Sequence, residues 1–100
     1  MNIVRKTFPV VTFERFCDLN SLIIEIDERP RWTGLPRYIA AVKDGETMRD
    51  GCLIGIYGNG ETEASAIKDL ERKLCGEMLA IRAMTPERRN IQCPNEWVQP

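Results

Sequence analysis

The sequence contains no histidine, and its four cysteines include no Cys-x-x-Cys pair: Cys17, Cys52, Cys75 and Cys93. Histidine is a common general base at neutral pH and a frequent zinc ligand, so the chain lacks a residue on which much acid-base and zinc chemistry depends. The wide cysteine spacing also gives no disulfide framework. We therefore expect reduced thiols, several of them in the core, with no metal site and no cofactor.

The chain also lacks a long apolar run. Residues 1–9 carry two charges and a proline, without the apolar stretch of a signal peptide. No later segment has the length and apolar character needed to span a bilayer. The sequence therefore predicts a cytoplasmic protein that does not bind a membrane.

Neither sign of charge dominates. The chain has 14 basic and 15 acidic residues among 100, a net charge of -1, which argues against a surface that binds polyanions in general. The content of 43% hydrophobic and 29% charged residues is typical of a globular domain. Because no linker or repeat divides the chain, we expect one domain over residues 1–93 and a C-terminal tail over residues 94–100.

The strongest local pattern is an amphipathic helix over residues 62–75. Apolar side chains recur at helical spacing on one of its faces: Ile67, Leu70 and Leu74. Thr62 can cap the first turn, and Gly76 stands where a left-handed C-terminal cap is needed.

A glycine-rich turn at residues 58–60 leads into this helix, an arrangement that can cradle a phosphate. The turn has no Gly-Lys-Ser/Thr motif, and Glu63 stands where a dinucleotide fingerprint has its third glycine. The carboxylates of Glu61 and Glu63 would repel an anion from the start of the helix. We therefore interpret the turn as structural.

The remaining pattern predicts antiparallel strands. Residues 21–28 alternate, with one apolar face formed by Leu22, Ile24 and Ile26. Further strands are expected over residues 36–43, 52–57, 77–83 and 90–93. We favour strand over helix for residues 77–83 because Gly76, directly before them, is a helix terminator. Residues 44–51 are expected to form a ragged hairpin connection.

A short helix near the N-terminus, capped by Thr12 and ending at Asn20, completes the expected elements. It carries an apolar side formed by Phe13, Phe16 and Cys17. The predicted fold class is α+β, with a small antiparallel sheet of three to five strands packed against one main helix.

Several of these segments resemble a set of small uncharacterised accessory proteins of tailed phages and prophages. The matching stretches are residues 13–17, 28–30, 57–62 and 85–89. The resemblance implies a phage or prophage origin and a place in the cytoplasm of the host cell. It implies no catalytic residue.

The residues themselves also point away from catalysis. Glu25 and Asp27 share one strand face, but a solvated sheet face explains them. Cys52 lies in an apolar strand, which does not activate a thiol. We therefore predict that the protein is not an enzyme.

Residues 29–38 hold three arginines and two aromatic residues with no acidic residue among them. Arginine with tryptophan or tyrosine is typical of interface hot spots and of surfaces that stack on single-stranded bases. The candidate partner-binding residues are Arg29, Arg31, Trp32, Arg37, Tyr38, Arg88 and Arg89. Trp32 could instead fold back over the sheet edge, and Trp97 either caps the core or stays free for a partner.

Two functions are compatible with this segment. The first is binding to a host or phage protein, which would inhibit or modulate a target such as a nuclease or a CRISPR-type effector complex of host defence. The second is binding to single-stranded nucleic acid or RNA, which gains support if Arg82, Arg88 and Arg89 lie beside the loop. The balanced charge favours the first function. An exposed edge strand would also allow a homodimer.

Overall fold

The computed structural model describes residues 1–3 and 11–100. Residues 4–9 of the segment in which we expected no signal peptide therefore lie outside the described residues. The described part contains two α-helices, seven strands and one 3-10 turn, η1. Their bounds are α1 (Phe13–Leu19), β1 (Ile24–Glu28), η1 (Arg31–Thr33), β2 (Tyr38–Val42), β3 (Gly45–Arg49), β4 (Cys52–Ile54), β5 (Gly58–Gly60), α2 (Glu63–Leu74), β6 (Met78–Ile81) and β7 (Arg89–Gln92).

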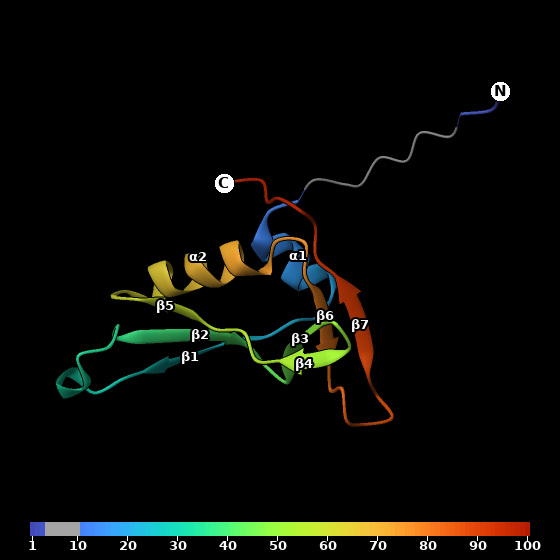
Figure 1. The fold of residues 1–100 in the computed structure, drawn as a ribbon. Helices are drawn as coiled ribbons and strands as arrows, with labels where there is room; N and C mark the ends of the chain where they lie inside the picture. Colours follow the sequence, from blue (N-terminus) through green and yellow to red (C-terminus); the bar gives the residue numbers. More distant parts are fainter. Residues whose placement is uncertain (4–10) are drawn as a thin grey trace.

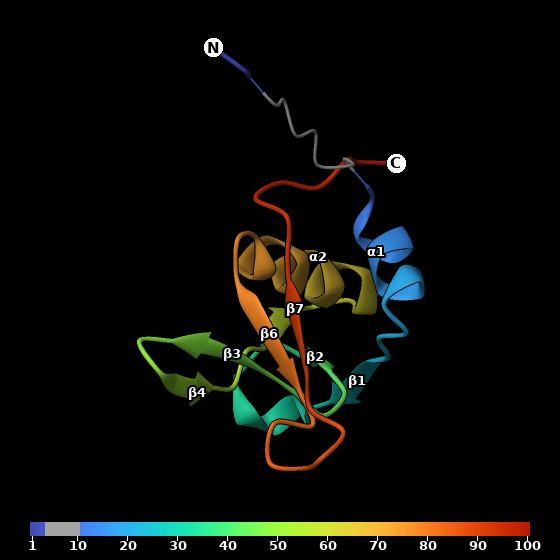
Figure 2. The ribbon, with the colours of Figure 1, turned by 90° about the vertical axis from the view of Figure 1, so that its right-hand side faces the viewer.

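The strands form two antiparallel sheets, one ordered β1-β2-β5 and the other β4-β3-β6-β7. Figure 1 shows α2 along one face of the first sheet, over β5 and β2. Figure 2 shows α1 on the same side of the sheets as α2. The predicted α+β class with antiparallel strands and one main helix is confirmed, and the strands are divided between two sheets.

Side-chain caps fix the first turns of both helices. The hydroxyl of Thr12 caps α1, which ends before Asn20. Thr62 and Ser65 form a reciprocal capping box at the start of α2, with both N–H···O distances at 3.0 Å. Gly76 follows α2 with φ of +72°, the left-handed conformation expected from the sequence.

The core lies between the two helices and the sheets. Its largest fully buried apolar side chains include Leu70 and Leu74 of α2 and Leu79 of β6. Residues 78–81 are a strand, which confirms the choice of strand over helix there.

Two strands lie where the sequence predicted irregular structure. The connection expected at residues 44–51 contains β3, which pairs with both β4 and β6. The turn expected at residues 58–60 is β5, which pairs with β2. The predicted strand over residues 52–57 is shorter than expected, since β4 ends at Ile54 and residues 55–57 pass from one sheet to the other.

The glycines of β5 are needed because α2 lies directly on this strand. A Cβ at Gly58 would come within 3.0 Å of the carbonyl oxygen of Ala66 and the amide nitrogen of Leu70. A Cβ at Gly60 would meet Ser65 and Ala66 equally closely. The two glycines thus allow helix and strand backbones to approach, which no larger residue permits.

The C-terminal segment packs on the helices through Trp97, which is only 9% exposed. Its ring lies edge-on to the rings of Phe13 and Phe16, with both centroid distances at 5.1 Å. The amide of Val98 donates to the carbonyl oxygen of Val11 at 3.0 Å. Of the two alternatives for Trp97, the structure shows that it caps the core.

Candidate functional site

The candidate site lies at the tip of a long hairpin formed by β1 and β2. The strands pair from Ile24 opposite Val42 to Glu28 opposite Tyr38. Residues 29–37 form the tip, which Figure 1 shows extending beyond the end of α2. The two neighbouring strands therefore hold the tip away from the rest of the molecule.

Local hydrogen bonds give the tip a defined conformation. The amide and the hydroxyl of Thr33 both donate to the carbonyl oxygen of Pro30, at 3.2 and 3.0 Å. The amide of Leu35 donates to the Thr33 hydroxyl at 3.3 Å. Gly34 closes the turn with φ of +71°, a conformation that glycine adopts without strain.

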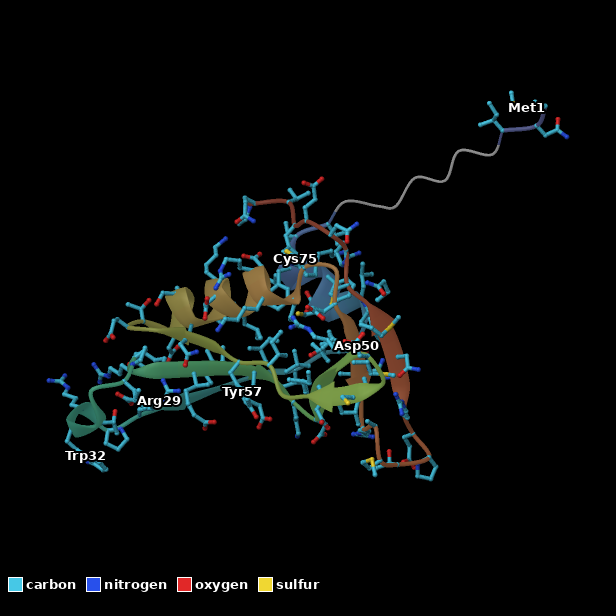
Figure 3. The ribbon with its side chains drawn as sticks, in the orientation of Figure 1. Met1, Arg29, Trp32, Asp50, Tyr57 and Cys75 are labelled. Carbon is cyan, nitrogen blue, oxygen red and sulfur yellow. The ribbon has the colours of Figure 1, made fainter. Side chains whose placement is uncertain are left out.

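The apolar side chains of the tip point into solvent. Trp32 is 86% exposed and Leu35 is 60% exposed. Figure 3 shows Trp32 at the outermost end of the hairpin, directed away from the sheet. Trp32 therefore does not fold back over the sheet edge.

Arg29 and Arg37 brace the base of the tip. Arg29 donates to the carbonyl oxygen of Pro36 at 2.8 Å and to Oδ1 of Asn59 in β5 at 3.0 Å. Arg37 donates to the Glu28 carboxylate at 2.6 Å, which raises the pKa of the guanidinium. Its guanidinium carbon also lies 5.3 Å from the ring centre of Tyr38.

Among the predicted site residues, Arg29 and Arg37 hold the loop in place, whereas others are free to contact a partner. Arg31 makes no ion pair within the described part of the chain, and it lies beside Trp32 at the exposed end. Leu35 lies within the predicted segment, but the sequence did not predict it as a contact residue. Its exposure depends on the backbone conformation of the loop, which the sequence alone does not determine. The contact groups of the hairpin tip, which comprises residues 29–37, are thus Arg31, Trp32 and Leu35.

Arg88 and Arg89 lie at the other end of the molecule, on the loop and strand that follow β6 (Figure 1). Arg88 donates to Oδ1 of Asn90 at 3.0 Å, and Arg89 donates to the carbonyl oxygen of Asn20 at 2.9 Å. Arg82 lies in the same region. The structure does not bring these arginines together with the hairpin tip.

The thiols differ strongly in exposure. Cys17 and Cys93 are buried, and burial raises the pKa of Cys17 to about 11 and that of Cys93 to about 12. Cys52 is exposed on β4. Within residues 1–3 and 11–100, no group of three or more histidine, cysteine or acidic residues could hold a metal ion.

No helix in the described part of the chain has the length and apolar character required to cross a membrane. Comparison with protein-family models, curated proteins and solved structures gave no match.

Proposed function

We propose that this protein is a non-enzymatic accessory protein that binds a partner protein through the hairpin tip. The observation that carries the proposal is the 86% exposure of Trp32 on a loop of defined conformation. Because the loop backbone is already ordered and tryptophan has only two side-chain dihedral angles to fix, binding costs little conformational entropy. Tryptophan is also among the residues enriched in interface hot spots.

The chemistry of the hairpin tip indicates the kind of surface that it fits. Trp32 and Leu35 would fill an apolar pocket, and Arg31 would contact a carboxylate on the rim of that pocket. In keeping with the resemblance to phage accessory proteins, we propose that the partner is a host or phage protein. Its activity would be modulated when the tip occupies the pocket.

The distribution of arginines supports a protein partner over single-stranded nucleic acid. Affinity for a nucleic acid strand depends on several cations that neutralise successive phosphates. At the tip, the Arg37 guanidinium is paired with Glu28, while Arg29 is hydrogen-bonded to neutral groups in the base of the loop. Arg88 and Arg89 are at the opposite end (Figure 1).

The test is a pull-down from host lysate with tagged protein, with and without nuclease treatment, followed by mass spectrometry. The wild type is compared with the double variant R31A/W32A and with M84A/R88A, which removes an apolar and a basic side chain at the other end. Met84 is 88% exposed, so this control matches the loss of exposed apolar surface. Urea unfolding of each variant checks that the fold is intact.

We expect a nuclease-resistant protein that the wild type and M84A/R88A retain and that R31A/W32A loses. Loss of the captured species on nuclease treatment would instead support nucleic-acid binding. Equal capture by the wild type and the folded R31A/W32A variant would contradict a role for the hairpin tip.

A further inference from the structure

A hollow of about 350 Å³ lies far from the hairpin tip, where the connection between α1 and β1, the β2–β3 turn and the β6–β7 loop meet. Three cationic side chains line it, and we call them the hollow's cations: Lys43, Arg82 and Arg89. Its apolar lining consists of Leu22, Ile23 and Ile81. Two carboxylates, of Asp44 and Glu87, and Ser21 complete the wall.

The backbone around this hollow has an unusual conformation. Ser21, Asp44 and Arg82 have φ values of +53°, +57° and +53°, in the left-handed region that favours glycine. They are three of the four non-glycine residues with positive φ in the described part of the chain. Ser21 and Asp44 stand in turns and Arg82 in a bend, where a left-handed residue reverses the chain. Three chain reversals therefore meet around the hollow.

Most N–H donors of the hollow's cations have no hydrogen-bond partner within the described residues. Arg82 approaches a carboxylate oxygen of Asp44 only at 3.8 Å, and both side chains are half exposed or more. Arg89 is anchored by one N–H···O bond of 2.9 Å to the carbonyl oxygen of Asn20. Within the described residues, Lys43 makes no side-chain hydrogen bond or ion pair. A guanidinium has five N–H donors, so most of the donors at this wall are available to a ligand.

We propose that this hollow binds a small organic anion. Its carboxylate or phosphate group would lie against the hollow's cations, and its apolar part would contact the apolar lining. The three cations outnumber the two carboxylates, so the wall of the hollow has a net positive charge. The proposal is independent of the hairpin tip, because the two regions share no residue and lie at opposite ends of the molecule (Figure 1).

The experiment uses phenyl phosphate as the probe and follows the amide signals of the isotope-labelled protein by NMR. Inorganic phosphate and phenol serve as its charged and aromatic halves. We expect saturable shifts at the amides of Ser21, Lys43 and Arg82, with phenyl phosphate bound more tightly than either half. Raising the salt concentration should weaken the binding.

Two sets of variants change the charge of the wall in opposite directions. K43Q/R82Q should weaken binding of phenyl phosphate about tenfold, from the loss of two exposed charge contacts. E87Q should strengthen it about threefold, because it removes a repelling carboxylate. K68Q/R72Q is the matched control for lost positive charge, since both residues lie on α2, and its affinity should equal that of the wild type.

Three results would overturn the proposal. One is a linear, unsaturated response spread over many lysines and arginines, which indicates general attraction of anions. Another is unchanged affinity in K43Q/R82Q with a wild-type melting temperature. Equal affinity for inorganic phosphate and phenyl phosphate would show that the apolar lining makes no contact and would exclude an organic ligand.

Discussion

The indole Nε1 of Trp97 donates a hydrogen bond of 2.7 Å to the backbone carbonyl oxygen of Glu71 in the last turn of α2. The last four carbonyls of a helix have no regular partner within the helix. The only other donor to this carbonyl oxygen in the described residues is the weak thiol donor of Cys75, whose Sγ lies 3.7 Å away, so the indole supplies its strong hydrogen bond. The C-terminal segment is thereby joined to the main helix as well as to α1.

Replacing Trp97 should therefore lower the free energy of unfolding in two distinguishable steps. Trp97→Phe keeps an aromatic ring against Phe13 and Phe16 but leaves the carbonyl oxygen with only the weak Cys75 thiol as donor, at a cost of about 1–2 kcal/mol. Trp97→Ala also empties the ring's site and should cost about 3–5 kcal/mol. Urea unfolding measures both. Equal stability of the wild type and W97A would show that the segment contributes nothing to the fold.

The two tryptophans should differ in fluorescence. Trp32 is 86% exposed, whereas Trp97 is 9% exposed. The single-tryptophan variant W97F should therefore emit at longer wavelength, and acrylamide should quench it strongly. W32F, which retains only Trp97, should emit at shorter wavelength and resist quenching. Similar quenching of the two variants would contradict the exposed placement of Trp32.

The contact between α2 and β5 predicts a severe effect of a single methyl group. Gly58→Ala places a Cβ against the backbone of α2, which must move away, and should destabilise the protein by about 3 kcal/mol or more. Gly51→Ala is the control, since a Cβ there meets no atom within 4 Å and the change only strains a φ of +79°. That strain costs about 1–2 kcal/mol. Thermal unfolding should rank Gly58→Ala as the more damaging, and the reverse order would contradict this packing.

Asp69 should make stability depend on pH in the acid range. Hydrogen bonds from Lys73 and from the amide of Asn59, both at 2.8 Å, together with Arg72, hold the pKa of Asp69 well below its usual range. The folded state thus favours the charged carboxylate. Its contribution is complete above the unfolded pKa of about 3.9 and is lost as pH falls from there through the folded value.

The pH effect is measured as the difference in unfolding free energy between the wild type and Asp69→Asn. The difference should shrink steadily as the solution is acidified below about pH 4. Asp27→Asn, at an exposed position of β1, should show no comparable trend. A difference that is constant with pH would contradict the proposed charge interaction.

The cysteines should react with an alkylating reagent in order of their exposure. Cys52 should react first in the folded protein, whereas Cys17 and Cys93 are buried and their raised pKa values keep them protonated. Mass spectrometry of partly modified protein would locate the adducts. The C52S variant should lose the rapid phase, and rapid modification of Cys93 would show that the core opens readily.

The helices and most strands could be predicted from the sequence because their signals are local. Thr12 and Thr62 are capping residues before apolar positions at helical spacing, and both caps are present in the structure. In contrast, β3 has a polar sequence in which only Thr47 is buried. It is a strand because β4 and β6 lie on its two sides, which depends on the order of strands across the sheet.

The candidate site was predictable in composition but not in shape. The arginine and tryptophan content of residues 29–38 identified the loop, and Pro30 and Gly34 indicated that it was irregular. Whether Trp32 faces solvent depends on how long the hairpin is relative to α2. Whether Arg88 lies near it depends on which sheet the last strand joins. Both are long-range properties of the fold that local sequence patterns do not carry.

The hydrogen bond from the amide of Asn59 to Asp69 also affects how molecules of this protein meet one another. An unpaired backbone amide on an edge strand can pair with a strand from another chain, which is the first step of aggregation. On the edge strand β5, the amide of Asn59 donates to the carboxylate of Asp69 and is therefore not available to another chain. On β1, at the opposite border, exposed Glu25 and Asp27 would face their own counterparts if two copies paired antiparallel. Acidic groups at both edge strands of this sheet, β1 and β5, thus oppose its pairing with further copies of the chain.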